Sequence, residues 1–367
     1  MSAELGSRPE SDTVASPNGA GPVLAVDAMG GDHGPVEVVA GVAMALRQKG
    51  VEARVLLVGD QPTLGKLLAE QGLRGDARVE VVQASEVIGM DEKPMAALKQ
   101  KKDSSMSRAI DLVKAGRAQG ILSLGNTGAL LAGGALKLRP MPGIERPALA
   151  SVIPSRGHRF VLIDAGANPD AAAIHLLHNA VLGANYARCA LGIERPRVGL
   201  LTIGTEEGKG SEKVLHAHTM LKAANGVLNY AGLVEGFQLF RGETDVVVCD
   251  GFTGNVLLKT LESCFSMLKD FLKDELKANP LRIAGALLAK GAFDTVKHEL
   301  SPETLGGAPL LGLTRLVIKA HGSSTRGYVA GAIRIAVATL AHDLTGLIRA
   351  DLDKLEAAGV GVNSVGA

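Results

Sequence analysis

The sequence predicts an α/β fold, in which helices cover both faces of a mostly parallel sheet. Short runs of Val, Ile and Leu alternate with Ala/Leu-rich stretches of helical character, and a polar turn containing glycine separates each run from the stretch that follows. The runs are apolar at nearly every position, which is typical of strands buried on both faces. The 46 glycines fit this pattern, since many stand at turns that require a positive φ or a close backbone approach.

Seven apolar runs are expected to form strands. They lie at residues 23–26, 54–58, 120–124, 159–163, 197–203, 245–249 and 315–319. The first precedes a helix that carries Pro35 in its first turn, where proline is well tolerated. Ligands bind at the carboxyl ends of the strands in open α/β sheets, so the polar residues that follow these runs are the expected site.

One segment, residues 255–300, contains no convincing strand. Leu257 and Leu261 lie four residues apart, and Leu268 follows seven residues later, as on one face of a long amphipathic helix. Asn279 and Pro280 interrupt the pattern, and a second helical stretch follows. We expect a helical hairpin that projects from the α/β body.

The two ends of the chain are expected to be tails. Residues 1–21 are polar and rich in Ser, Gly and Pro, which predicts a disordered N-terminal tail, and residues 351–367 are expected to form a C-terminal tail. Residues 22–350 then form a single domain that includes the hairpin. No uncharged apolar run approaches the roughly 18 residues that a membrane-spanning helix needs, and a soluble protein, at most lying on a membrane, is expected.

Charge and cysteine content exclude several classes of function. The 39 basic and 38 acidic residues give a net charge of +1, which provides no overall field for nucleic acid, and base-stacking aromatics are few. Three cysteines, Cys189, Cys249 and Cys264, match neither a disulfide framework nor a zinc site, which indicates a reducing cytoplasm. No metal, cofactor or nucleic-acid partner is expected.

Several separate blocks carry a resemblance to a known family. VDAMGGDHGP, GNTGAL, RVGLLTIGTEEGKG, DVVVCDGFTGNVLLKTLE, GGAPLLG and VIKAHGSS occur in an order similar to that of the bacterial phosphate acyltransferases of phospholipid synthesis, the PlsX family. The resemblance implies transfer of a long-chain acyl group from acyl carrier protein to inorganic phosphate. It also implies a fold like that of isocitrate and isopropylmalate dehydrogenases and phosphotransacetylases, and a homodimer. The expected location is the inner face of the cell membrane, where the downstream glycerol-3-phosphate acyltransferase would be a partner.

Three glycine turns have the form of anion sites: Gly30–Gly34, Gly125–Gly128 and Gly251–Asn255. A turn that opens onto a helix N-terminus presents backbone N–H groups and a positive dipole end to phosphate. We expect the three turns to converge on one sheet edge, although each is also an ordinary helix cap when taken alone. The phosphate-binding and acyl-binding residues expected from them are Gly30, Gly31, Asp32, Asn126, Thr127, Gly128, Thr253 and Gly254.

Lys209 in GTEEGKGSE is the leading catalytic candidate, because a flexible cation at a strand end can hold phosphate or neutralise charge on the thioester oxygen. The loop departs from the Walker A pattern in its glycine spacing and in the Gly after the lysine. Asn255 is expected to donate to the developing oxyanion, and His33 and His321 to bind phosphate or protonate the leaving thiolate. A solvated lysine, a cap and structural histidines are the alternatives.

Other polar residues are expected to support the site. Asp27, Asp164 and Asp250 each end a strand, where a carboxylate orients a lysine, histidine or amide, or serves the structure alone. Ser104 and Ser105 are expected to add hydroxyl groups to the phosphate site. No cysteine stands at a nucleophile elbow, so direct attack of phosphate on the thioester is preferred over an acyl-enzyme.

Docking surfaces follow from charge and apolar spacing. Acyl carrier protein is acidic, and two basic clusters suit it: Lys99–Lys102, and Arg282 with Lys290 and Lys297. The second arm of the hairpin is expected to touch a membrane, although a dimer contact or an acyl-chain groove is an equal alternative. The apolar residues expected at the lipid surface are Leu281, Leu287 and Leu288.

Three other functions remain as alternatives. A transferase that uses short acyl-CoA would share the fold, and the hairpin argues for a carrier-protein substrate instead. A decarboxylating NAD-dependent dehydrogenase would need a clustered set of carboxylates for its metal and a dinucleotide loop, and neither is evident. A non-catalytic scaffold for carrier protein at the membrane would not need the intact GTEEGKG and DGFTGN loops.

Overall fold

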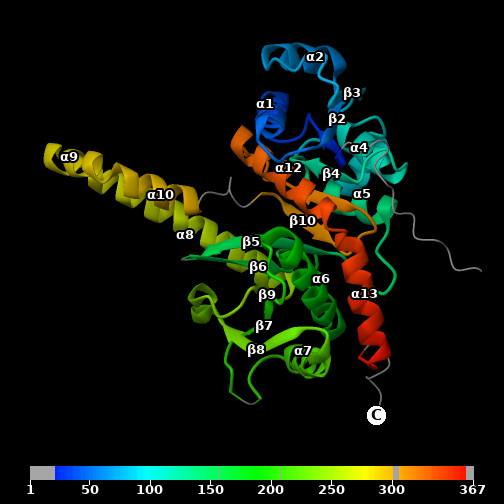
Figure 1. Cartoon of the computed structure of the whole chain (residues 1–367), viewed down its shortest axis with the longest axis vertical. Coiled ribbons are helices and arrows are strands. Elements are labelled where there is room, and N and C mark those ends of the chain that lie inside the picture. Colours follow the sequence, from blue (N-terminus) through cyan, green and yellow to red (C-terminus); the bar gives the residue numbers. More distant parts are fainter. Residues whose placement is uncertain (1–20, 156, 207, 301–305, 361–367) are drawn as a thin grey trace, which may run out of the picture.

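The computed structural model describes residues 21–155, 157–206, 208–300 and 306–360. Within these ranges the backbone forms one sheet of 11 strands, with helices on both faces and a helical hairpin that projects from its middle (Figure 1). The predicted class, an α/β fold with a mostly parallel sheet and a protruding hairpin, is confirmed. The predicted N-terminal tail lies outside the described residues except for Gly21.

The strand order across the sheet is β3-β2-β1-β4-β11-β10-β5-β6-β9-β7-β8. The strands are β1 (Val23–Asp27), β2 (Arg54–Gly59), β3 (Val79–Gln83), β4 (Gly120–Ser123), β5 (Ala148–Ser155), β6 (His158–Ile163), β7 (Arg197–Thr202), β8 (Asn229–Glu235), β9 (Val246–Val248), β10 (Ala308–Leu311) and β11 (Leu316–Lys319).

All seven predicted strands form, and β3, β5, β8 and β10 were not predicted. β3 and β8 lie at the two edges of the sheet and are mostly half-buried, so they lack the continuous apolar character that marks the central strands. β5 and β10 contain Pro154 and Pro309, and proline argues against a central strand. Both of these strands pair antiparallel to their neighbours.

The sheet consists of two parallel sets that run in opposite directions. β1, β2, β3, β4 and β11 are parallel to one another, and so are β6, β7, β8 and β9. The antiparallel strands β10 and β5 lie between the sets and reverse the direction. Ile163 pairs with Ala150 and Ile318 pairs with Pro309, so β6 and β11 finish at a similar level. The carboxyl ends of both sets therefore meet near the middle of the molecule. The Gly251–Asn255 turn follows β9, which runs opposite to β1 and β4, so the prediction that all three glycine turns share one sheet edge is wrong for this turn.

Helices cover both faces of each set. They are α1 (Gly34–Arg47), α2 (Gln61–Glu70), α3 (Pro94–Gln100), α4 (Ser105–Lys114), α5 (Thr127–Leu138), α6 (Ala173–Leu191), α7 (Glu212–Ala223), α8 (Gly251–Lys277), α9 (Pro280–Leu288), α10 (Lys290–Leu300), α12 (Arg326–Ala341) and α13 (Leu344–Ala357). In β1, Leu24 and Val26 join a core with α1 and α12, while Val23 and Ala25 join a core with α4 and α5. This alternation explains why the strand is apolar throughout.

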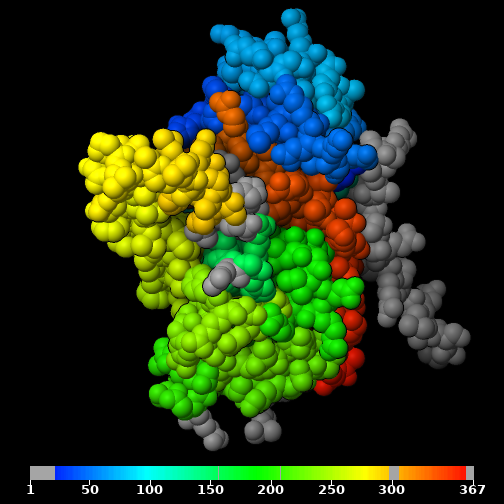
Figure 2. Space-filling view, turned by 60° about the vertical axis from the view of Figure 1, so that its left-hand side comes forward, coloured from blue at the N-terminus to red at the C-terminus, as the bar shows by residue number. Residues whose placement is uncertain are grey.

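The hairpin consists of α8, α9 and α10 and extends away from the sheet (Figures 1 and 2). Asn279 caps α9, and its Oδ1 accepts a hydrogen bond from the Arg282 N–H at 2.9 Å. The predicted second helical stretch is two helices, because α9 ends before Ala289 and α10 begins at Lys290. The α8 residues Leu257, Leu258 and Leu261 pack against the body, which anchors the base of the hairpin.

The predicted C-terminal tail is wrong for residues 351–357, which belong to α13. Asp351 is buried and accepts hydrogen bonds from Asn185 and Arg188 of α6, at 3.1 and 2.7 Å. Leu355 is also buried. The tail was predicted because small and charged residues dominate this stretch. The apolar positions that pack in the same core as α6 were not recognised. The prediction for residues 361–367 lies outside the described residues.

In the described part of the chain, no single helix combines the length and apolar character needed to cross a bilayer. α12 and α13 qualify only when taken together, and a bend of 52° separates them. Both helices carry side chains that are buried in the core.

Candidate active site

The site begins where β1 and β4 end side by side. The buried Asp27 closes β1, and the Ser123 hydroxyl at the end of β4 donates a hydrogen bond to its Oδ2 at 2.6 Å. The two following turns touch through their backbones, because a Cβ at Gly30 would lie 2.7 Å from the Gly125 nitrogen and 2.8 Å from Asp27 Oδ2. Only glycine fits at position 30. Two of the three predicted glycine turns are thus brought together.

The Asp27 carboxyl has a raised pKa. Burial is the main cause, since removal from water disfavours the charged form, and hydrogen bonds from Ser105, Ser123 and the Met29 and Gly30 backbone oppose it. Its Oδ1 has no hydrogen-bond partner among the described residues. Ser105, predicted as a phosphate ligand, therefore contacts Asp27.

We expect the Asp27→Asn variant to gain stability relative to the wild type as the pH rises. A raised carboxyl pKa means that the folded state holds its proton above the unfolded value of 3.8, so stability is lost between 3.8 and the folded pKa. The amide cannot ionise and escapes this loss, which is on the order of 1 kcal/mol for each tenfold difference between the folded and unfolded acid dissociation constants. Urea unfolding of both proteins from about pH 4 to about pH 7 measures the difference. A difference that stays constant with pH would contradict a raised pKa.

A third loop joins the first two. The Asp32 backbone N–H donates to the Gly322 carbonyl at 2.8 Å, and Gly31 has φ +93°, with a Cβ there meeting the same carbonyl at 2.9 Å. The loops that hold His33 and His321 are therefore adjacent, and the predicted roles of the two histidines stay predictions. His321 Nδ1 lies 2.9 Å from the Ser323 hydroxyl, and His33 stands before α1 without capping the helix by its side chain.

The residues predicted at the start of α5 have structural partners. Asn126 Oδ1 accepts from the Ala129 N–H at 3.0 Å, and its amide donates to the carbonyls of Gly89, Met90 and Glu92. These bonds use the whole side chain, so it acts as a cap and holds the segment before α3. Thr127 is exposed. A Cβ at Gly128 would lie 2.5 Å from Pro94, which explains the glycine by packing.

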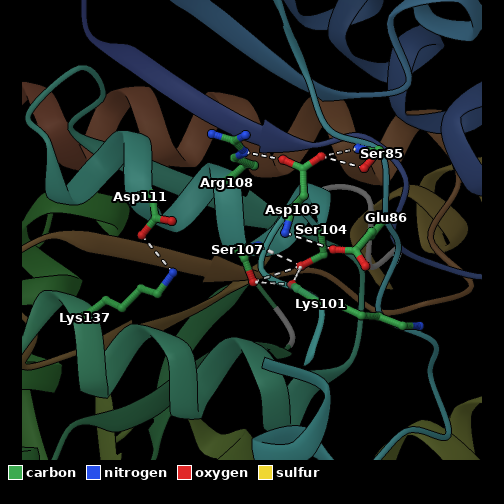
Figure 3. Close-up of polar contacts among 9 residues, drawn as sticks. All are labelled: Ser85, Glu86, Lys101, Asp103, Ser104, Ser107, Arg108, Asp111 and Lys137. Carbon is green, nitrogen blue, oxygen red and sulfur yellow. Dashed lines mark hydrogen bonds and ion pairs between the residues drawn. The ribbon is translucent and has the colours of Figure 1, made fainter. Parts of the chain in front are cut away.

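Ser104 also serves the local structure (Figure 3). It is fully buried, caps α4 through the Ser107 N–H at 3.3 Å, and donates to the Lys101 carbonyl at 2.9 Å. The neighbouring Asp103 binds Ser85 and Arg108 on either side, which lowers its pKa to about 2. The start of α4 is therefore held by internal bonds that engage the Ser104 hydroxyl, and its role in phosphate binding stays a prediction.

Asp164, at the end of β6, organises the loop that follows it. Its Oδ1 accepts from the N–H groups of Leu149, Gly166 and Ala167, and its Oδ2 accepts from the backbone and the side chain of Asn168, at 2.7 to 3.1 Å. The carboxylate is completely buried. Five donors fill its acceptor positions, so Asp164 acts as the hub of this loop.

α8 begins directly on the Asp164 loop. A Cβ at Gly254 would lie 2.0 Å from the Asp164 carbonyl oxygen, and one at Gly251 would lie 2.8 Å from Asn168 backbone atoms. Asp250 caps the helix by accepting from the Thr253 N–H at 2.8 Å. Because this carboxylate already occupies the helix N-terminus, the third glycine turn is a capped turn and not an open anion cradle.

Lys213 of α7 pairs with the same cap, its Nζ lying 2.5 Å from Asp250 Oδ2. Burial raises the pKa of Asp250, but hydrogen bonds from Lys213 and Thr253 outweigh it, so the pKa lies below its ordinary value. Asn255 extends from the first turn of α8 to the Asp164 loop, where a Cβ at Gly166 would lie 3.5 Å from its Oδ1. Lys213 was not among the predicted residues.

Lys209 lies in the exposed loop after β7, where its Nζ is 2.7 Å from Glu206 Oε1. The Glu206 carboxylate raises the pKa of this lysine. The described contacts do not bring Lys209 to Asp27, Asp250 or Asn255. Its catalytic role remains a prediction.

Lys319, at the end of β11, is a second lysine that sequence reasoning missed. Its exposed fraction is 8%, and burial, reinforced by the positive charge of Lys259 on α8, lowers its pKa to about 8 despite the opposing charge of Asp32. Register places Asp27, Ser123 and Lys319 level on three adjacent strands. The signal was present in the sequence, because RLVIK ends an apolar strand with a lysine directly before AHG.

The molecule has the overall fold of solved phosphotransacylases. It is similar to a phosphotransacetylase from Streptococcus pyogenes (TM-score 0.59, 18% identity, covering 89% of this chain and 95% of that one). It is also similar to a branched-chain phosphotransacylase from Enterococcus faecalis V583 (TM-score 0.53, 16% identity, covering 87% and 99%).

The family follows from sequence comparison. A family model described as "Fatty acid synthesis protein" matches residues 23–345. The chain is 47% identical over 314 residues to a phosphate acyltransferase from Nitratidesulfovibrio vulgaris, covering 86% of this chain and 90% of that protein. A phosphate acyltransferase from Heliobacterium modesticaldum is 45% identical over 313 residues, covering 85% and 92%. The chain belongs to this family and is an acyltransferase that acts on phosphate, which confirms the predicted resemblance.

Proposed function

We propose that the protein moves a long-chain fatty acyl group from acyl carrier protein to inorganic phosphate and so supplies acyl phosphate for phospholipid synthesis. Family membership supports the transfer to phosphate. The observation that carries the choice of donor is the hairpin, whose first helix begins at the strand-end loops and whose apolar side chains stay exposed. A small thioester such as acetyl-CoA would leave this apolar surface without a use.

The proposed reaction is a direct displacement. A phosphate oxygen attacks the thioester carbonyl carbon, a C–O bond forms, and the C–S bond breaks as the carrier thiolate leaves and takes up a proton. Asn255 donates to the developing oxyanion, and His33 or His321 supplies the proton. Burial raises the pKa of Cys189 to about 11 and raises that of Cys249 further, which disfavours an acyl-enzyme at these two cysteines.

The direct test uses the purified full chain with palmitoyl carrier protein. Thiol release that depends on phosphate, together with formation of palmitoyl phosphate, is the expected result. Thiol release without phosphate, or none at all, would refute the proposal. Faster turnover of acetyl-CoA than of the carrier substrate would favour the short-chain transacylase. One equivalent of acyl-enzyme trapped by rapid quench would refute direct displacement.

Lys209 is proposed to act in this reaction by holding phosphate or the thioester oxygen, which requires it to leave Glu206 when substrate binds. Turnover of the Lys209→Met and Glu206→Gln variants tests the lysine charge and the glutamate charge separately. The lysine change is expected to slow turnover at least about tenfold. The glutamate change frees the lysine, so retained or improved turnover is expected. Equal turnover of Lys209→Met and wild type would identify a solvated loop lysine.

Carrier-protein docking is proposed at the basic clusters. In the first, Lys99 and Lys102 are exposed, while Lys101 Nζ is already paired with Glu92 at 2.5 Å and bonded to the Val87 carbonyl. In the second, Arg282 is paired with Glu275. The side-chain position of Lys297 lies outside the described residues. Lys99 and Lys102, which have no acidic partner among the described residues, are the preferred docking contacts.

The hairpin is proposed to bring the enzyme, as a homodimer, to the inner face of the cell membrane, where the downstream glycerol-3-phosphate acyltransferase would receive the product. Leu281, Leu287 and Leu288 are 84%, 68% and 91% exposed, which is unusual for leucine and supports lipid contact.

We expect the double change Leu287→Glu and Leu288→Glu to lower binding to anionic liposomes at least about tenfold, since each buried leucine is worth roughly 1.5–3 kcal/mol. Turnover of a soluble donor should be retained. Co-sedimentation with phosphatidylglycerol vesicles measures binding. The matched control is Leu136→Glu, a 62% exposed leucine on α5 outside the hairpin, which should bind as the wild type does. Unchanged binding of the double variant would count against membrane contact.

A further inference from the structure

A buried lysine lies at the centre of the molecule without a counter-ion. Lys319 is 8% exposed, and its ammonium donates to the carbonyl of the next residue, Ala320. Among the described residues, no carboxylate lies within ion-pair distance of it. Lysine is rarely buried unless it is paired, because an isolated charge is costly to remove from water. A single carbonyl also leaves two of its three donors available.

The neighbouring carboxylates do not supply the missing charge. Asp27, level with Lys319 in the sheet, stands two strands away, which is roughly 10 Å, and the Ser123 hydroxyl between them is directed to Asp27. Asp32 acts on Lys319 electrostatically but forms no ion pair with it. The acidic residues around this lysine therefore leave it without an ion-pair partner among the described residues.

A second cation acts electrostatically on the first. Lys259 is one helical turn beyond Asn255 on α8, and its charge repels that of Lys319. Repulsion between these two like charges is unfavourable, and an anion bound near both would relieve it. Lys259 is exposed and pairs with Glu262 at 2.8 Å, so Lys319 gains more than Lys259 from a bound anion.

Two further features point to the same anion. The Ser324 hydroxyl, in the loop that follows β11, is buried without a hydrogen-bond partner among the described residues. α1 begins at Gly34 beside this loop and has no side-chain cap, so its positive end is open. By contrast, α5 and α8 are capped by Asn126 and Asp250.

We propose that Lys319, supported by Lys259, seats the phosphate group at the carboxyl end of β11. The ligand class is a phosphate group, either inorganic phosphate or the phosphate ester of a carrier-protein arm, and the uncovered donors suit a small dianion best. This inference rests on the proposed function for its role in turnover, but the binding site itself stands on the buried, unpaired cation.

The test compares Lys319→Met, which keeps the side-chain volume, with Lys66→Met, an exposed lysine on α2. Without phosphate, the Lys319 variant should unfold at a higher temperature than the wild type, because an apolar group replaces a buried charge. Added inorganic phosphate should raise the unfolding temperature of the wild type and of Lys66→Met but not of Lys319→Met. In titrations, the affinity for inorganic phosphate should fall roughly 10- to 100-fold. In turnover, KM for phosphate should rise while KM for the acyl donor changes little.

Several outcomes would overturn the inference. Wild-type affinity of Lys319→Met for both inorganic phosphate and phosphopantetheine would overturn it. Loss of phosphopantetheine binding alone, with inorganic phosphate unaffected, would support a site for the carrier arm and refute a site for inorganic phosphate. If Lys319→Met fails to fold, the Lys259→Gln variant is the deciding test. It should weaken phosphate binding about two- to fivefold, because the charge that it removes is exposed and therefore contributes little. Unchanged phosphate binding by this variant would refute the site. A protein that binds phosphate through Lys319 but transfers no acyl group would refute the proposed function alone.

Discussion

Replacing Asp164 with alanine is expected to lower the free energy of unfolding by about 3–5 kcal/mol and to abolish turnover. The change removes an acceptor that serves five N–H donors in a site closed to water, and each buried donor without a partner costs about 1–3 kcal/mol. Turnover should disappear because α8, with Asn255, begins on this loop. Urea unfolding and the phosphate-dependent thiol assay measure the two effects.

Two companion variants define the cause. Asp164→Asn keeps one acceptor oxygen but turns an amide donor toward other donors, so an intermediate loss of stability is expected. Asp170→Ala removes an exposed carboxylate from the same loop and should stay within about 0.5 kcal/mol of the wild type. A stable Asp164→Ala protein would show that the loop can satisfy its backbone groups without the carboxylate.

The Gly254→Ala variant is expected to lose about 3 kcal/mol or more of stability and most of its activity. Its Cβ would lie 2.0 Å from the Asp164 carbonyl oxygen and 2.9 Å from Cys249 Sγ. Neither the main chain nor a buried strand residue can yield by that much, so α8 must move away from β6. The displacement would carry Asn255 and Lys259 with it. Chemical unfolding and turnover both report the effect.

The matched control is Gly285→Ala in α9, where a Cβ meets nothing within 4 Å. Alanine is a better helix former than glycine by about 1 kcal/mol, so this variant should be equal to or more stable than the wild type. If both variants behave alike, the close approach of α8 to the Asp164 loop has no energetic weight.

The seven predicted strands were recognisable because they are apolar at nearly every position, and periodicity likewise revealed the long α8 helix. Strand direction was not predictable. The antiparallel β5 and β10 reverse the sheet, and their prolines and short apolar runs disguise them as loops. An edge strand such as β3 is half-buried and gives too weak a pattern. Sequence periodicity reports which faces are buried, whereas direction depends on which distant segments pair.

In the candidate site, the predicted meeting of the Gly30 and Gly125 turns is confirmed by their backbone contact. What a motif could not reveal is how each polar side chain is already used. Asn126 has the sequence of an anion turn, yet four hydrogen bonds engage it. Lys319 has the sequence of a strand end, yet it is buried and unpaired. The number of partners around a residue depends on tertiary packing, and sequence spacing alone does not determine it.

The position of β10 and β11 has a consequence for how the polypeptide is made. These strands come from residues 308–319, but they sit between β4 and β5, near the middle of the sheet. A nascent chain that has reached α10 therefore holds two separate sets of strands whose inner edges are both unpaired. Contacts so distant in sequence form slowly, and open strand edges invite association with other chains. Completion of the sheet must wait until nearly the whole protein has left the ribosome, which makes the incomplete chain the form most in need of chaperone protection.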